Sequence, residues 1–130
     1  LVVDDEPMMR DVVARILESD GCATATASSV DEALEMIGLH PIDVVVSDIN
    51  MPNRTGLDLL KQVRNQAPEM AVILMTGYGD MYTVKDSLLL GADEYIAKPF
   101  KSYEIAMLVR RAHWRKMAEH NRPAREGSKR

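Results

Sequence analysis

Short apolar runs alternate along the chain with segments in which apolar residues recur every three or four positions. The runs are rich in β-branched residues, which predicts buried strands, whereas the recurring spacing predicts amphipathic helices. Near-continuous apolar strands that alternate with helices are typical of an α/β fold, with a parallel sheet covered on both faces. The expected strands are residues 1–3, 22–26, 42–46, 71–75 and 94–97.

Capping and breaking residues give the ends of the expected helices. Serine and aspartate favour the position before a helix, proline is tolerated in its first turn, and glycine commonly follows its last residue. A fourth helix is expected from Asp80 to Leu90, and the periodicity of the last helix fades after Met117. Of the other expected helices, one begins near Pro7, one near Leu57, one after a cap at Ser28 or Ser29 and one after a cap at Ser102.

Charged and hydroxyl side chains stand at the carboxyl ends of the expected strands. Asp4 and Asp5 follow the first strand, Asp48 closely follows the third, Thr76 follows the fourth and Lys98 follows the fifth. In a doubly wound sheet, ligands bind beyond these ends. If the strands are neighbours in one sheet, three carboxylates, a hydroxyl and an ammonium therefore meet in one crevice.

Such a crevice suits Mg²⁺, because clustered carboxylates repel one another until a hard cation with a preference for oxygen ligands joins them. The cluster has no set of His and Cys ligands, which argues against zinc. An aspartate beside Mg²⁺ is a competent nucleophile toward phosphorus. The metal and Lys98 would balance the charge on a transferred phosphoryl group, with no general base required.

Four segments together resemble the response-regulator receiver family of two-component signalling, the CheY-like superfamily. They are Val2–Glu6, Ser47–Pro52 followed by Gly56, Met75–Gly77 and Tyr95–Phe100. The resemblance covers residues 1–117 and implies a flavodoxin-like (βα)5 fold with strand order 2-1-3-4-5. Residues 118–130 are expected to be a disordered basic tail or linker.

The resemblance also implies roles for individual residues at the phosphorylation site. Asp48 matches the phosphoacceptor, and Asp5 and Asp48 match direct Mg²⁺ ligands. Asp4 would act on the metal mostly through water, and the backbone carbonyl of Asn50 would be a further ligand. Lys98 would pair with the phosphoryl group.

Further implied features concern switching and the lifetime of the phosphorylated state. Thr76 matches a switch hydroxyl that moves toward the phosphoryl group, and Tyr95 matches an aromatic whose rotamer follows it. Asn50 and Tyr78 would tune the lifetime of the phosphoryl group. The Lys98–Pro99 peptide bond is expected to be cis, because proline lowers the cost of that isomer.

Expected partners follow from the same resemblance. The phosphoryl donor would be a sensor histidine kinase or a phosphotransfer protein. Three consecutive leucines, Leu88–Leu90, cannot all be buried by one helix face, so the surface from the fourth helix to the fifth is a candidate homodimer or partner surface. A C-terminal output domain could follow the chain, and only such a domain would contact nucleic acid.

Composition and charge agree with one domain in a reducing, cytoplasmic compartment. Of 130 residues 46% are hydrophobic, no run is long enough to span a bilayer, and Cys22 is the single cysteine. The net charge of −4 divides into +6 from Arg110 onward and −10 before it. We interpret the basic end as a solvated helix end and linker, because an acidic body does not suit nucleic acid.

Three other functions use parts of the same pattern. A degenerate receiver that binds partners without phosphorylation is disfavoured because all the required residues are present. A hydrolytic phosphotransferase with an Asp nucleophile usually has a second aspartate two residues on, where this chain has Asn50. A flavin or dinucleotide domain would carry a glycine-rich loop after the first strand, where this chain has Asp4–Glu6.

Overall fold

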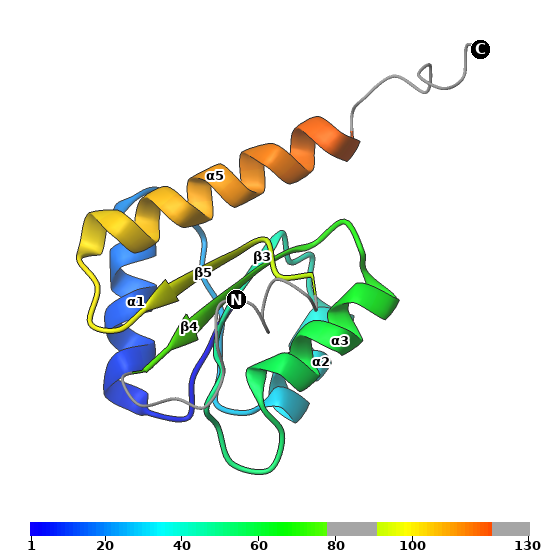
Figure 1. The fold of residues 1–130 in the computed structure, drawn as a ribbon, viewed down its shortest axis with the longest axis horizontal. Helices are drawn as coiled ribbons and strands as arrows, with labels where there is room; N and C mark the ends of the chain where they lie inside the picture. Colours follow the sequence, from blue (N-terminus) through cyan, green and yellow to red (C-terminus); the bar gives the residue numbers. More distant parts are fainter. Residues whose placement is uncertain (78–90, 121–130) are drawn as a thin grey trace.

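The computed structural model describes residues 1–77 and 91–120 (Figure 1). The expected helix from Asp80 to Leu90, together with Tyr78 and Leu88–Leu90, lies outside these residues, and so does the tail from residue 121. No helix within the described part of the chain is long and apolar enough to cross a membrane. The described elements are β1 (Val2–Val3), α1 (Pro7–Ser19), β2 (Thr26–Ala27), α2 (Val30–Leu39), β3 (Val44–Asp48), α3 (Gly56–Gln66), β4 (Ala71–Thr76), β5 (Glu94–Ala97) and α5 (Ser102–His120).

All five strands form one parallel sheet in the order β2-β1-β3-β4-β5, which confirms the expected topology. Helices α2 and α3 pack on one face of the sheet, and α1 and α5 pack on the other (Figure 1). Every residue of β4 is buried, because a central strand between two helical layers is covered on both faces. Consecutive residues of β4 face opposite layers: Leu74 packs on the side of α2 and α3, and Met75 packs on the side of α1 and α5.

Two strands differ from the sequence prediction by two or more residues, and β1 and β4 differ from it by one residue at one end. Strand β2 covers only Thr26–Ala27 instead of residues 22–26, because β1 offers only Val2 and Val3 as pairing partners. Strand β3 covers Val44–Asp48 instead of residues 42–46, because each of these five residues has a partner in β4. The hydrophobic pattern thus located both strands, and the length of the neighbouring strand determined their ends.

Helix starts follow capping chemistry, with one correction. The Ser29 side chain accepts a hydrogen bond from the backbone N–H of Glu32, and Thr55 and Asp58 form a reciprocal capping box at the start of α3. Ser102 was expected to precede the last helix but is its first residue. The backbone N–H of Lys101 donates to the Glu104 carboxylate at 2.7 Å, so Lys101 occupies the capping position.

Asp93 fixes the start of β5 at the end of the sheet that lies away from the carboxylates. Its carboxylate accepts hydrogen bonds from the backbone N–H of Val72 and from the Arg64 guanidinium, both at 2.7 Å. Arg64 also donates to the carbonyl of Gly91 at 2.7 and 2.9 Å. These contacts join α3, β4 and the segment before β5, which is the strand that leads to Lys98.

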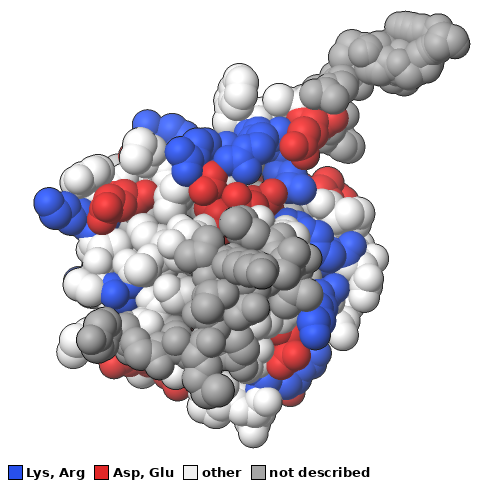
Figure 2. All heavy atoms as spheres, in the orientation of Figure 1, with Lys and Arg blue, Asp and Glu red and all other residues white. Residues whose placement is uncertain are grey.

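Basic side chains gather along α5 next to acidic ones (Figure 2). Arg111 and Arg115 both pair with Glu94 of β5, Arg110 pairs with Asp20, and Lys116 lies 3.4 Å from Asp93. The basic character found in the sequence from residue 110 onward is therefore balanced, within the described part, by Glu94 of β5, by Asp93 just before it and by Asp20 just after α1.

Candidate functional site

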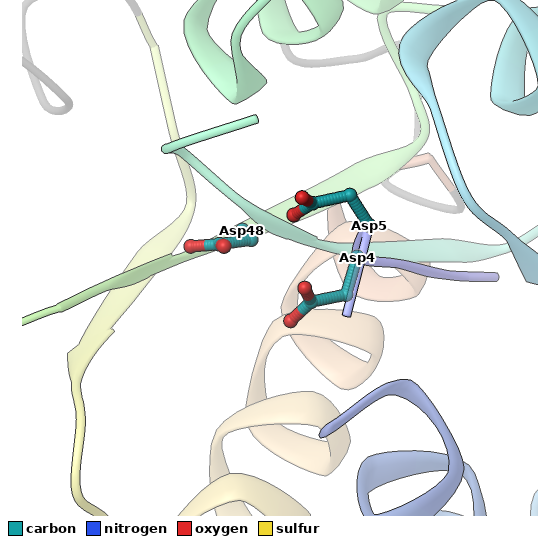
Figure 3. Close-up of side chains that lie close together, drawn as sticks. All are labelled: Asp4, Asp5 and Asp48. Atoms are coloured by element: carbon teal, nitrogen blue, oxygen red, sulfur yellow. The ribbon is translucent and has the colours of Figure 1, made fainter. Parts of the chain in front are cut away.

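Three carboxylates meet at the carboxyl edge of the sheet (Figure 3). Asp4 and Asp5 directly follow β1, and Asp48 is the last residue of the neighbouring strand β3. One oxygen from each carboxylate lies within 4.8 Å of the others. Asp4 and Asp48 are buried and Asp5 is exposed, so the cluster opens to solvent on the side of Asp5.

Lys98 brings an ammonium group to two of these acids. Its Nζ lies 3.5 Å from Asp4 Oδ2 and 3.4 Å from Asp48 Oδ2. The Lys98 backbone N–H donates to the Thr76 carbonyl at 2.7 Å, which holds the residue beside the end of β4, and the Lys98–Pro99 peptide bond is cis. One ammonium facing three carboxylates leaves the cluster net negative.

Among the acids of the site, Asp48 has the pKa that its surroundings shift most clearly. Its pKa is raised from 3.8 to about 6, chiefly because the carboxyl is buried and in smaller part because of the neighbouring Asp4 charge. The Lys98 ammonium and the backbone N–H of Asn50, which donates to this carboxylate, oppose that rise. Ionised Asp48 is therefore held at an energetic cost, which an additional cation at the cluster would reduce.

Asp4 is fixed by contacts that sequence reasoning missed. Its Oδ1 accepts a hydrogen bond from the backbone N–H of Glu6 at 3.0 Å, and its carbonyl accepts one from Arg10 at 3.0 Å. The acidic turn was visible in the sequence, but no spacing rule indicated that the arginine of the following helix would reach back to it.

The start of α3 lies against the peptide of Asp48. A Cβ atom built on Gly56 would stand 2.5 Å from the carbonyl oxygen of Asp48 and 2.9 Å from the Cα of Ile49. The Gly56 N–H donates to the Ile49 carbonyl at 2.9 Å, so the two segments are also bonded. Gly56 belongs to the segment Ser47–Pro52 with Gly56 that resembles the receiver family, but its steric role depends on how α3 packs against β3.

The remaining predicted residues differ in how closely they approach the cluster. Thr76 is buried at the end of β4, one residue beyond the partner of Asp48. Tyr95 is half-buried on β5 and pairs with Leu74, farther from the edge. Asn50 is exposed just after β3, and Tyr78 lies outside the described residues.

The donor set fits a hard divalent cation. The oxygen donors converge from two adjacent strands, and no His or Cys belongs to the cluster found among the described residues. Mg²⁺ is commonly bound by carboxylates and water in such sites. These residues could therefore hold a metal ion.

Comparison with known proteins gives the family. The sequence profile described as the response regulator receiver domain matches residues 1–110, most of the chain. The chain belongs to the response regulator receiver family. As a receiver, it is a module of two-component signalling rather than a conventional enzyme.

Relatives of the receiver include larger regulators. It is 39% identical over 111 residues to the DNA-binding transcriptional regulator NtrC of Escherichia coli strain K12, covering 85% of this chain and 24% of the relative. It is 38% identical over 111 residues to the transcriptional regulatory protein FixJ of Azorhizobium caulinodans, covering 84% and 52%. The chain thus spans about a quarter of the length of the NtrC relatives it matches.

Solved structures agree with the fold. A response regulator receiver domain protein from Clostridium thermocellum superposes with a TM-score of 0.85 at 35% identity, covering 91% of this chain and 95% of that one. The receiver domain of NtrX from Brucella abortus gives a TM-score of 0.82 at 36% identity, covering 87% and 96%.

Proposed function

We propose that the receiver is a phosphoacceptor switch in a two-component phosphorelay, and that Asp48 accepts the phosphoryl group in the cytoplasm. The observation that carries this proposal is the convergence of Asp4, Asp5, Asp48 and the Lys98 ammonium at one edge of the sheet. The donor is a phosphohistidine on a sensor histidine kinase or a phosphotransfer protein.

Mg²⁺ is the proposed cofactor. Asp5 and Asp48 would bind it directly, Asp4 would act through water, and the backbone carbonyl of Asn50 would supply a further ligand. When bound, the ion neutralises charge on the phosphoryl oxygens. The raised pKa of Asp48 supports this assignment, because a site that disfavours a lone ionised carboxylate gains from a cation.

The transfer needs little from the protein beyond position and charge. A carboxylate oxygen of Asp48 forms a bond to phosphorus as the bond from phosphorus to the histidine nitrogen breaks, and the electron pair of that bond stays on the imidazole. Lys98 lies within 3.5 Å of Asp48 and can pair with the equatorial oxygens of the phosphoryl group as their charge grows. Asn50 and Tyr78 tune the lifetime of the product.

The proposed switch couples the position of Thr76 on β4 to the rotamer of Tyr95 on β5. Tyr95 pairs with Leu74, which lies two residues before Thr76 on the same face of β4. The side chains of Thr76 and Tyr95 are therefore diagonal neighbours on adjacent strands. Movement of Thr76 toward the phosphoryl group shifts the population of Tyr95 rotamers and alters the surface from the fourth helix through β5 to α5.

Phosphorylation at Asp48 is the first test. The receiver incubated with Mg²⁺ and a small phosphodonor is expected to gain one phosphoryl group, which peptide mass spectrometry after borohydride trapping assigns to Asp48. Asp48→Ala removes the adduct, a chelator prevents it, and Asp11→Asn, at an exposed aspartate of α1, leaves it in place. Phosphorylation that persists in Asp48→Ala would refute the assignment.

Thr76→Ala separates switching from chemistry. The variant is expected to accept the phosphoryl group to a similar final extent, because Asp48 and Lys98 remain, but to respond at the Tyr95 surface several-fold less. The amide chemical shifts of β5, recorded with and without beryllofluoride, measure that response. A full response of β5 in Thr76→Ala would contradict the proposed coupling.

The partners that this function requires are proposals as well. The NtrC relatives are DNA-binding transcriptional regulators, so we propose that a C-terminal output domain contacts nucleic acid. The surface formed by the expected fourth helix, β5 and α5 would regulate this domain. It would do so either by direct contact or by forming a homodimer. The alternative is a degenerate receiver that acts as a scaffold, which the complete set of carboxylates and lysine disfavours. The phosphorylation test distinguishes the two.

A further inference from the structure

Arg10 occupies a position at which a basic side chain does not favour its own helix. It is the fourth residue of α1, and a positive charge near the N-terminus of a helix opposes the helix dipole. The first turn of α1 carries no acidic residue that would offset this charge. Helix formation alone therefore gives no reason for an arginine here, and the reason must lie in what its side chain contacts.

The Arg10 side chain reaches back to the backbone at the carboxyl edge of the sheet. Helical side chains point toward the N-terminus of their helix, and the Arg10 guanidinium donates to the Asp4 carbonyl at 3.0 Å. This carbonyl belongs to the peptide group that joins Asp4 to Asp5. Because a peptide group is planar, a bond that fixes its oxygen also restricts the direction in which Asp5 continues the chain.

The orientation of this peptide group matters because Asp4 and Asp5 are consecutive residues. In a continuing strand consecutive side chains would point to opposite faces, whereas both carboxylates extend toward Asp48 (Figure 3). The chain must therefore turn directly after β1. The Glu6 N–H, which donates to Asp4 Oδ1 at 3.0 Å, holds the carboxylate of Asp4 in this turn, and Arg10 holds its carbonyl.

The charge of Arg10, taken alone, would have the opposite effect on metal binding. A positive charge near the carboxylates repels a cation, so its removal would strengthen metal binding if charge alone mattered. Arg10 also interacts with an acid outside the cluster: the pKa of Glu32 is lowered, chiefly by hydrogen bonds from Ser28 and in smaller part by the Arg10 charge. Positioning and repulsion thus predict changes of opposite sign when Arg10 is replaced.

We propose that Arg10 is a positioning residue for the metal ion, because its bond to the Asp4 carbonyl keeps the Asp5 carboxylate directed at the cluster. In this role Arg10 touches neither the ion nor the phosphoryl group. The inference rests on the metal binding included in the proposed function, in which Asp5 would be a direct ligand. Groups that orient metal ligands commonly contribute about tenfold or more in affinity, so the effect of positioning is expected to exceed that of repulsion.

Arg10→Met tests the proposal, because it removes the donor and the charge but keeps an unbranched side chain. Amide chemical shifts of the 130-residue chain, titrated with MgCl₂, measure the dissociation constant. We expect a value about tenfold higher for Arg10→Met than for the unmodified receiver. Arg15→Met, the same change at an exposed arginine of α1, is expected to alter it by less than about twofold.

The outcomes separate this inference from the proposed function. If Arg10→Met binds Mg²⁺ as tightly as the unmodified receiver or more tightly, the positioning role is wrong and the proposed metal site stands. If the unmodified receiver does not bind Mg²⁺, the metal site is wrong and the inference is overturned with it.

The metal-free protein and a second variant distinguish positioning from a merely structural role. Positioning predicts that Arg10→Met shifts the amide signals of Asp5 and Glu6 in the absence of metal and leaves those of β4 and β5 in place. An arginine that only stabilised α1 would instead lower the urea midpoint and leave the Mg²⁺ affinity of the folded protein unchanged. Arg10→Lys retains the charge and a donor, so it should bind Mg²⁺ more tightly than Arg10→Met. Affinity of Arg10→Lys equal to or below that of Arg10→Met would overturn the proposal.

Discussion

Gly56→Ala is expected to lower the free energy of unfolding by about 3 kcal/mol, because its methyl group has no space. The new Cβ would stand 2.5 Å from the Asp48 carbonyl oxygen and 2.9 Å from the Ile49 Cα. Both are backbone atoms of the segment that carries Asp48 and cannot rotate away as a side-chain tip would. Relief requires α3 to move away from β3, which stretches the bond from the Gly56 N–H to the Ile49 carbonyl.

Gly38→Ala is the matched control. Gly38 lies in α2 and is exposed, and a Cβ atom added to it would meet no other atom within 4 Å. The same substitution there is expected to stabilise the protein by up to about 1 kcal/mol, because alanine favours the helix. Urea denaturation followed by circular dichroism measures both variants. Equal effects at the two positions would show that the close approach of α3 to Asp48 is not the cause.

Asp48→Asn is expected to stabilise the metal-free receiver at pH 7 by about 2 kcal/mol. The pKa of Asp48 is raised from 3.8 to about 6, chiefly by burial, so the folded state disfavours the ionised carboxylate. Between about pH 4 and pH 6 the folded protein holds a proton that the unfolded chain has released, and stability contributed by this group falls as pH rises. Asparagine has a similar shape and stays neutral, so the variant does not lose stability as the pH rises.

The difference in stability between Asp48→Asn and the unmodified receiver should therefore shrink as pH falls from 7 and nearly vanish near pH 4, as measured by denaturation at several pH values in chelator. Mg²⁺ should stabilise the unmodified receiver more than Asp48→Asn, because the variant lacks one carboxylate of the cluster. Asp5→Asn, at an exposed acid of the same cluster, should change the stability of the metal-free protein much less. An Asp48→Asn variant less stable than the unmodified receiver at pH 7 would contradict the electrostatic picture.

Much of the fold could be predicted from local patterns. Strand β5 was predicted at its observed residues, Glu94–Ala97, because Gly91 and Pro99 restrict the segment on both sides. The extents of β2 and β3 could not be predicted in the same way, because they depend on which residues the neighbouring strands offer. Helix α5 continues to His120, past Met117 where the periodicity weakens, since helix formation does not require the inner apolar pattern in every turn.

The convergence of the site residues at one edge of the sheet could be predicted from the sequence. The contacts that fix their positions could not. Parallel strands present their carboxyl ends at one edge, so the order of the strands already placed Asp4 near Asp48. The Arg10 contact to the Asp4 carbonyl and the fit of Gly56 against Asp48 depend on how helices dock onto the sheet. Such contacts join residues through space, and a sequence pattern carries no direct signal for them.

The approach of Lys98 to Asp4 spans 94 positions of the chain. During synthesis, the three acids leave the ribosome long before the lysine does, and β5 joins the sheet only at its edge. A nascent chain that ends before residue 98 thus carries every carboxylate of the cluster without the ammonium that faces them. Under the proposed function, the site that would accept the phosphoryl group therefore becomes complete only when nearly the entire domain has been made.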